Sequence, residues 1–124
     1  MKDIFYLVIL VFLTSCSTSF VAKHGQLSVK GTQLVDKNQQ QIMLRGMSLG
    51  WHSMWPRFYN QFAVSWLKKD FNANVVRAAL GVELGEYGNY VNDKNFAKEK
   101  IYTVIDGAIK NNIYVIVDWH SHNI

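Results

Sequence analysis

The pattern of apolar and polar residues predicts strands that alternate with helices along most of the chain. Residues 74–80 and 113–117 are short, nearly continuous apolar runs bounded by turn residues, which is typical of strands buried on both faces. Apolar residues recur at helical spacing over 61–70 and again over 96–109. Because helices of this kind join parallel strands, the pattern favours an α/β fold with a parallel sheet.

The region ahead of these elements predicts a hairpin, a short extended segment and a loop. Apolar and polar residues alternate at 27–29 and 33–35 on either side of Gly31, which indicates a β-hairpin. Extended chain is expected again over 41–44, whereas 48–59 has no period and is expected to be an aromatic-rich loop. On the helix that follows, these apolar side chains are expected to face the core: Phe62, Ala63, Trp66, Leu67 and Phe71.

The first residues predict an export signal rather than part of the fold. Residues 4–13 form an unbroken apolar run that is too short to span a bilayer, which takes about 20 residues. Leu13 and two small residues then precede Cys16, an order that resembles a bacterial lipobox, in which the cysteine is lipidated. We therefore expect a signal peptide over 1–16, a polar tether over 17–24 and a folded part over 25–124.

This reading places the protein outside the cytoplasm. A lipidated Cys16 would anchor it to a membrane, since several acyl chains on one residue hold a protein stably. The expected location is then the bacterial outer membrane or the cell surface. An ordinary secretory signal with a chance cysteine is the alternative, and it would make the protein a secreted one.

Composition and charge exclude several classes of protein. A chain of 124 residues allows one small domain, and 49% hydrophobic with 18% charged residues predicts a packed fold rather than disorder. The net charge of +4 is scattered, with no run longer than the Lys68-Lys69 pair, so nucleic acid is not an expected partner. A single cysteine excludes an internal disulfide framework and a cysteine-rich zinc site. No glycine-rich phosphate-binding motif follows any expected strand.

An arginine inside an apolar strand is the first candidate for chemistry. Arg77 lies near the end of the run at 74–80, where a guanidinium is costly unless it meets a carboxylate or a functional cleft. Two interpretations stay open. Arg77 either forms a structural ion pair within the sheet, or it orients a catalytic carboxylate at the mouth of the fold.

Polar residues that alternate after the last strand are the second candidate. Asp118, His120 and His122 would point to the same side if the chain stays extended. Such a cluster suits a zinc site, a site that hydrogen-bonds sugar hydroxyls, or a structural role with His122 as a loop residue. Tryptophans expected near the same rim could stack on pyranose rings or pack in the core. They are Trp51, Trp55 and Trp119, with His52 and Tyr59 nearby.

Taken together, these motifs resemble the N-terminal part of the glycoside hydrolase family 5 cellulases. The resemblance covers about 26–123 and rests on ordered segments at the right separations. Leu-Arg-Gly-Met-Ser-Leu-Gly-Trp stands at 44–51, Asn-Val-Val-Arg-Ala-Ala at 74–79 and Ile-Tyr-Val-Ile-Val-Asp-Trp-His at 113–120. The family consists of retaining endo-β-1,4-glucanases on a (β/α)8 TIM barrel. The chain would then supply the N-terminal hairpin and the first three strands of that barrel with two helices.

The resemblance implies roles for particular residues. Arg77 matches the family's active-site arginine, which hydrogen-bonds the nucleophile glutamate, and His120 matches the histidine that lines the cleavage subsite. His52 and Trp55 fall in the loop that lines the glycone subsites, and His122 is a further substrate-binding candidate. The implied partner is a β-glucan, with no cofactor or metal and a monomeric protein.

The two catalytic glutamates of the family have no match here. Both the acid/base glutamate of the Asn-Glu-Pro motif and the nucleophile would lie beyond Ile124, so we expect the 124-residue chain by itself to be inactive and poorly folded. Two other functions stay open. One is a metal-dependent TIM-barrel hydrolase that uses His120 and His122, and the other is a non-catalytic, glycan-binding surface lipoprotein.

Overall fold

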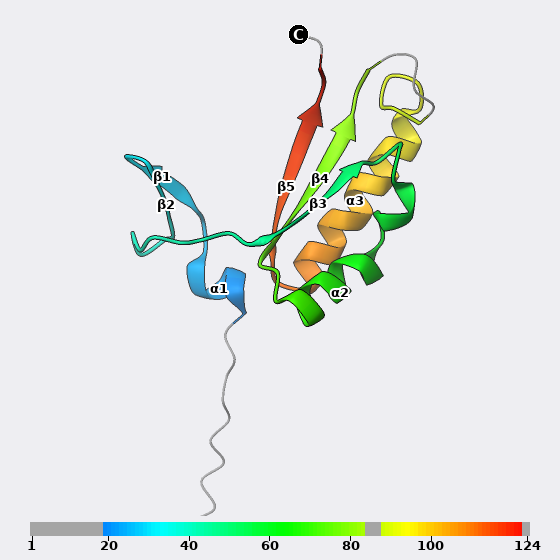
Figure 1. Cartoon of the computed structure of the whole chain (residues 1–124). Helices are drawn as coiled ribbons and strands as arrows, with labels where there is room; N and C mark the ends of the chain where they lie inside the picture. Colours follow the sequence, from blue (N-terminus) through cyan, green and yellow to red (C-terminus); the bar gives the residue numbers. More distant parts are fainter. Residues whose placement is uncertain (1–18, 84–87, 123–124) are drawn as a thin grey trace, which may run out of the picture.

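A three-stranded parallel sheet with two helices on one of its faces forms the body of the structure (Figure 1). The structure is a computed structural model and describes residues 19–83 and 88–122. The elements of this body are β3 (Gly46–Trp51), α2 (Gln61–Phe71), β4 (Val75–Gly81), α3 (Lys94–Lys110) and β5 (Tyr114–His120). Strand β4 is central and pairs in parallel with β3 and β5, which confirms the expected α/β class.

Both helices begin and end at residues that suit those positions. The side chain of Asn60 accepts a hydrogen bond from the backbone of Ala63 at 2.8 Å and caps α2, which ends at Asn72 in the left-handed conformation with φ 51°. Asp93 caps α3 in the same way through the backbone of Phe96 at 2.9 Å. The predicted helices are therefore confirmed to within a few residues.

A hairpin and a short helix precede the sheet. Strands β1 (Ser28–Lys30) and β2 (Gln33–Val35) pair antiparallel, as predicted. Part of the expected tether is instead the helix α1 (Phe20–His24), so the segment differs from the prediction. A 3-10 turn, η1 (Pro56–Phe58), lies between β3 and α2.

Hydrogen bonds explain why α1 is ordered. Nδ1 of His24 lies 2.9 Å from a carboxylate oxygen of Asp36, which is only 3% exposed. The hydroxyl of Tyr114, at the start of β5, donates to the carbonyl of Gly25 at 2.6 Å. The bond from His24 holds the pKa of Asp36 below its usual value, with backbone bonds from Gln40 and Asn38 acting in the same direction.

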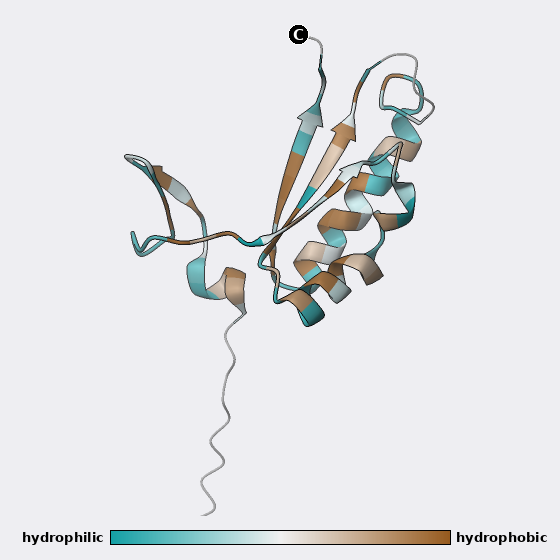
Figure 2. Ribbon diagram, in the orientation of Figure 1, coloured by the Kyte–Doolittle hydropathy of each residue, from teal (hydrophilic) through white to brown (hydrophobic). Residues whose placement is uncertain are grey.

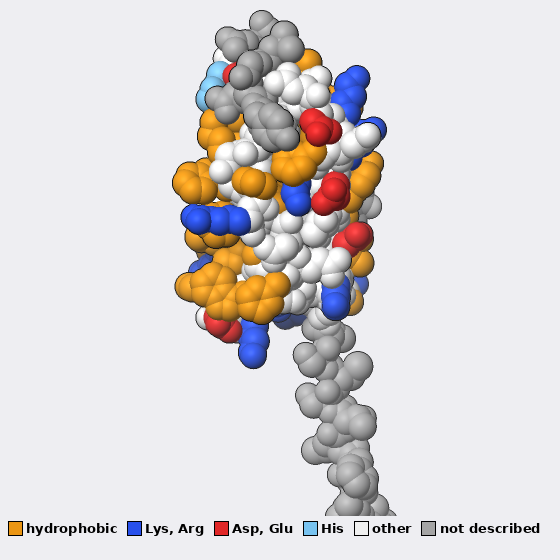
Figure 3. Space-filling model, turned by 90° about the vertical axis from the view of Figure 1, so that its right-hand side faces the viewer, with side chains coloured by type: hydrophobic (Ala, Val, Ile, Leu, Met, Phe, Trp, Pro, Cys, Tyr) orange, Lys and Arg blue, Asp and Glu red, His pale blue; other side chains and the backbone are white. Residues whose placement is uncertain are grey.

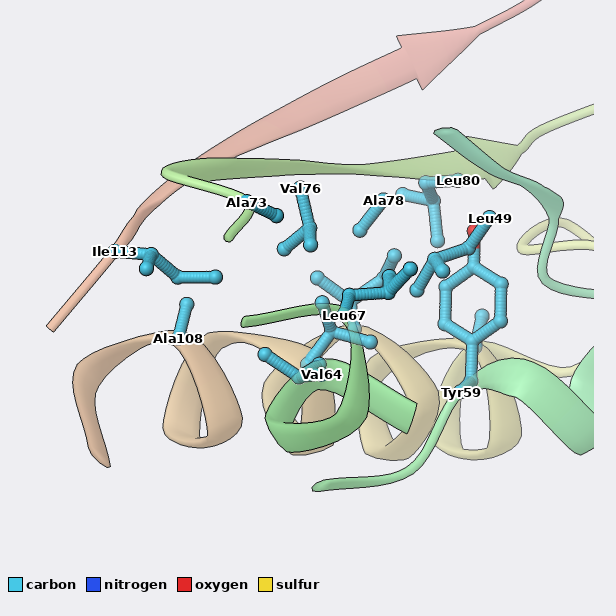
Figure 4. Packing of buried hydrophobic residues seen from close by; sticks show 13 residues of the cluster. Leu49, Tyr59, Val64, Leu67, Ala73, Val76, Ala78, Leu80, Ala108 and Ile113 are labelled. Atoms are coloured by element: carbon cyan, nitrogen blue, oxygen red, sulfur yellow. The ribbon is translucent and has the colours of Figure 1, made fainter. Parts of the chain in front are cut away.

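The core lies between the sheet and the two helices. Strand β4 turns Val76, Ala78 and Leu80 toward the helices, where they meet Val64 and Leu67 of α2 (Figure 4). Because successive side chains of a strand point to opposite faces, the residues between them face away from the helices. The helix α3 completes this core with Ala97, Ile101, Val104 and Ala108.

The expected position of the first sheet strand and the expected start of the loop after it are both wrong. The first strand is Gly46–Trp51, about five residues beyond the extended segment expected at 41–44 and partly within the expected loop. Its position is set by pairing with β4 rather than by a local pattern. An added Cβ at Gly46 would lie 1.7 Å from the carbonyl oxygen of Val75, so this pairing needs a glycine there.

The outer face of α2 also differs from the prediction. Phe62, Trp66 and Phe71 are 80%, 46% and 63% exposed, whereas Val64 and Leu67 are buried. The sheet and α3 contact α2 from one side only, so the described residues leave its other side uncovered. Apolar side chains are accordingly visible on the helix-bearing side of the molecule (Figure 3).

We expect Leu67→Ala to lower the free energy of unfolding of the intact protein by about 2–5 kcal/mol, because the substitution opens a cavity in the core. Leu67 is 5% exposed and packs under the sheet. Denaturant unfolding followed by circular dichroism measures the change. The matched control is Lys69→Ala on an exposed position of the same helix, which should stay within about 0.5 kcal/mol. Equal losses in both variants would contradict this description of the core.

Candidate active site

A cluster of polar side chains lies on the sheet face that the helices leave open. The strand register places Ser48 of β3 beside Arg77 of β4, and Asp118 and His120 of β5 opposite Ala79 and Gly81. Hydropathy changes along β5 from apolar to polar toward its carboxyl end (Figure 2). Carboxyl ends of parallel strands are where α/β folds place their sites.

Arg77 lies between two acceptors. Its Nη2 donates to Oδ2 of Asp118 at 2.6 Å, and its Nη1 donates to Oγ of Ser48 at 2.9 Å. The side chains of Arg77 and Asp118 are 35% and 27% exposed, so the ion pair is partly withdrawn from water. The structural ion pair, one of the two interpretations of Arg77, is therefore present. The open face of the sheet is also compatible with the other interpretation, in which Arg77 orients a catalytic carboxylate.

The same aspartate oxygen also contacts a histidine. Oδ2 of Asp118 lies 2.7 Å from Nδ1 of His120, so one carboxylate serves both Arg77 and His120. The alternation of polar residues at the end of the last strand predicted this proximity. A charge-assisted bond of this kind is stronger than a neutral one and fixes the imidazole ring.

Two aromatic rings contact His120. The ring of Trp51 packs against His120 and His122, with centroids 5.1 Å away in each case. The two histidine rings lie 5.3 Å apart, as expected if they project to one side. The backbone of His122 donates to Oε1 of Glu83, which ties the ends of β4 and β5 together. Glu83 lies in a stretch without periodicity, so the sequence does not predict this contact.

His52 lies in the interior rather than on an open surface. It is fully buried, its Nδ1 accepts from the backbone of Gly81 at 3.1 Å, and its Nε2 donates to the carbonyl of Gly88 at 2.7 Å. Burial lowers the pKa of His52 and favours the neutral ring. Both ring nitrogens are thus engaged with backbone, and in this structure His52 joins the end of β4 to the loop at Gly88 instead of facing an open surface.

Trp55 occupies a different place from the polar cluster. It is 47% exposed, stacks on Phe58 with centroids 6.3 Å apart, and lines a cavity of about 410 Å³ between β3 and α2. Trp66 and Met47 line the same cavity, so its walls are largely apolar. Ser48 is the one residue that this cavity shares with the cluster around Arg77.

Tyr59, expected near the aromatic rim, has a supporting role that the sequence did not reveal. Its buried hydroxyl donates to the carbonyl of Gly50 at 2.5 Å and accepts from the backbone of Ala79 at 2.9 Å. These bonds join β4 to β3 where the strand register shifts between Ser48 and Trp51. Tyr59 thereby fixes the carboxyl end of β3 beside Arg77. A single tyrosine in an aperiodic stretch carries no signal for such a role.

Among the described residues, no three histidine, cysteine or carboxylate side chains are grouped so that they could hold a metal ion. In the same part of the chain, no helix is long and apolar enough to cross a membrane. Cys16, the expected lipidation site, and the expected signal peptide lie outside the described residues.

Solved structures share this arrangement of sheet and helices. A structure from Cytophaga hutchinsonii is similar with a TM-score of 0.78 and 42% identity, over 84% of this chain and 33% of that one. The catalytic domain of Thermobifida fusca endoglucanase Cel5A is similar with a TM-score of 0.73 and 27% identity, over 83% and 33%. The expected fold is therefore confirmed, because the chain matches TIM-barrel structures over about a third of their length.

Sequence comparison defines the family. The family model for cellulase (glycosyl hydrolase family 5) matches residues 35–124, and the chain belongs to that family. An endoglucanase of Clostridium saccharobutylicum is 38% identical over 106 residues, which are 86% of this chain and 22% of that protein. The cellulase CelDZ1 of a Thermoanaerobacterium species is 47% identical over 90 residues, which are 73% and 22%. The chain thus spans less than a quarter of the length of these relatives.

We expect Tyr59→Phe to lower the free energy of unfolding by about 1–3 kcal/mol, because the carbonyl of Gly50 and the amide of Ala79 lose their buried partner. Burial raises the pKa of Tyr59 from 10.0 to about 12, so the folded state favours the neutral phenol. That contribution to stability is complete below about pH 10 and is lost as the pH rises toward 12.

Absorbance of tyrosinate at alkaline pH measures this titration. The difference between wild type and Tyr59→Phe should show one phenol that ionises near pH 12. A Tyr59 that ionises at the ordinary value, or a variant as stable as the wild type, would contradict the buried bond. Tyr102→Phe on the exposed face of α3 is the control.

Proposed function

We propose that the protein to which this chain belongs is an endo-β-1,4-glucanase that cleaves β-glucans with retention of anomeric configuration. The cluster of Arg77, Asp118 and His120 at the carboxyl edge of the sheet is the observation that carries this proposal. Family membership supports it, as do relatives named endoglucanase and cellulase. A variant of the Thermobifida fusca enzyme has been solved in complex with cellotetraose.

Retaining hydrolysis uses two carboxyl groups about 5–5.5 Å apart. One protonates the leaving oxygen, and the other forms a covalent glycosyl-enzyme that water then hydrolyses. In this proposal both groups come from outside these 124 residues, while this chain supplies parts of the site around them. Arg77 donates to the nucleophile carboxylate and orients it, and His120 binds a hydroxyl of the sugar in the cleavage subsite.

The aromatic residues bind substrate in this proposal. The rings of Trp51 and His122 lie beside His120, and an aromatic face suits the apolar faces of a glucose ring. Trp55 lies farther along the β3 side and is assigned to a glycone subsite. His52 has both ring nitrogens bonded to backbone, so its contribution is to shape the loop.

The two alternative functions predict different experimental results. A metal-dependent hydrolase would lose activity on chelation, whereas the glucanase uses no metal for its chemistry. In this structure Nδ1 of His120 faces Asp118, which leaves a single ring nitrogen for any ligand. A non-catalytic lipoprotein would bind glucan without releasing soluble sugar.

We expect Arg77→Ala to lower kcat/KM of the intact protein on cellohexaose by about a hundredfold or more, because a charge-assisted bond to the nucleophile is lost. The matched control is Arg45→Ala, on an exposed arginine at the opposite end of β3, which should stay within about twofold. Product analysis by NMR should show the β anomer first. An inverted product, or equal activity of both variants, would contradict the mechanism.

Lipidation of Cys16 is a separate part of this proposal. We expect Cys16→Ser to abolish incorporation of a fatty-acid label and to move the protein from the membrane to the soluble exported fraction. Metabolic labelling with an alkyne fatty acid and fractionation measure both effects. Unlabelled wild-type protein in the medium would instead support an ordinary secretory signal.

A further inference from the structure

Asp118 joins two residues of the candidate site through a single oxygen atom. Its Oδ2 lies 2.6 Å from Nη2 of Arg77 and 2.7 Å from Nδ1 of His120, and these two nitrogens are 3.0 Å apart. We propose that Asp118 is a positioning residue that keeps the proton of His120 on Nδ1, so that Nε2 accepts a hydrogen bond from a substrate hydroxyl. This inference rests on the proposed function, which gives His120 its place in the cleavage subsite.

The short contact between His120 and Asp118 indicates where the proton lies. An ionised carboxylate has no hydrogen to donate, and arginine has no lone pair with which to accept. If Nδ1 of His120 carried no hydrogen, its lone pair would face the lone pairs of Asp118 Oδ2 at 2.7 Å, which is repulsive. With a hydrogen on Nδ1, both His120 and Arg77 donate to Oδ2 of Asp118, and the 3.0 Å contact between Nη2 of Arg77 and Nδ1 of His120 is then not a hydrogen bond.

The proton on Nδ1 determines what the other nitrogen can do. In the neutral imidazole one nitrogen donates and the other accepts, so Nε2 of His120 is left as an acceptor. Among the described residues none forms a hydrogen bond with Nε2, and the rings of Trp51 and His122 lie beside this imidazole. A sugar hydroxyl that reaches Nε2 must therefore act as the donor.

The same carboxylate also sets the direction of Arg77. One amino group of the guanidinium is bonded to Asp118 and the other to Ser48, so the planar group is held from both sides. The remaining N–H groups are then presented in a fixed direction to an incoming carboxylate. Without Asp118, Arg77 loses its carboxylate partner among the described residues and with it this orientation.

A built-in reference makes the tautomer measurable. His52 has the opposite arrangement, because its Nδ1 accepts from Gly81 and its Nε2 donates to Gly88. In the intact protein labelled with ¹⁵N-histidine, long-range ¹H–¹⁵N correlation should show Nδ1–H for His120 and Nε2–H for His52. The set of signals that disappears in His120→Gln belongs to His120, which identifies its tautomer.

The variants separate positioning from folding. Asp118→Ala should shift His120 toward the Nε2–H tautomer that free histidine prefers, and should leave His52 unchanged. It should lower kcat/KM on cellohexaose by about tenfold to a hundredfold, with a raised KM, because Nε2 then no longer accepts. Asp118→Asn keeps an acceptor oxygen and should restore the Nδ1–H tautomer together with part of the activity. Asp70→Ala, on an exposed aspartate of α2, is the control and should stay within about twofold.

Each outcome bears on the proposal. A wild-type spectrum with Nε2–H at His120 overturns it before any variant is made. If Asp118→Ala does not fold, Asp118→Leu has a similar volume without an acceptor, and an unchanged Nδ1–H tautomer in either variant also overturns it. An intact protein that does not hydrolyse β-1,4-glucans refutes the proposed function alone, because the tautomer is measured without substrate.

Discussion

A cationic side chain in the middle of an apolar strand constrains this whole structure. The guanidinium of Arg77 is partly withdrawn from water, and a charge in such a place is costly unless acceptors surround it. Asp118 and Ser48 supply those acceptors from the two neighbouring strands. The register of β3, β4 and β5 therefore matters on both faces of the sheet, because a slip of one residue would turn Arg77 into the core.

One face of the sheet packs against the helices and stabilises the fold, and the other carries the polar cluster of the candidate site. Val76, Ala78 and Leu80 bind the sheet to its helices, whereas the alternate positions on the strands carry the polar cluster. The buried hydroxyl of Tyr59 links these roles, since it fixes the end of β3 at the point where the register shifts. Buried polar groups of this kind are hydrogen-bonded and thereby specify a single backbone arrangement.

Much of this arrangement could be predicted from local pattern, and the exceptions have physical causes. The capped helix after Asn60 has a periodic apolar pattern and the segment around Arg77 a continuous apolar one, and neither pattern depends on distant residues. The alternation of Asp118 and His120 indicated one shared face, although the sequence could not show that a single oxygen contacts both partners. Strand β3 was misplaced because its position depends on pairing with β4. Exposure of Trp66 depends on which elements cover α2, which its own helical spacing does not reveal.

A crystal structure of the intact protein with a cello-oligosaccharide is the most direct test of this account. We expect a glucose ring at the carboxyl edge of the sheet, with a hydroxyl within hydrogen-bond distance of Nε2 of His120. Arg77 should contact both Asp118 and a glutamate carboxylate. A sugar bound only in the apolar cavity beside Trp55, with no glutamate near Arg77, would contradict the account.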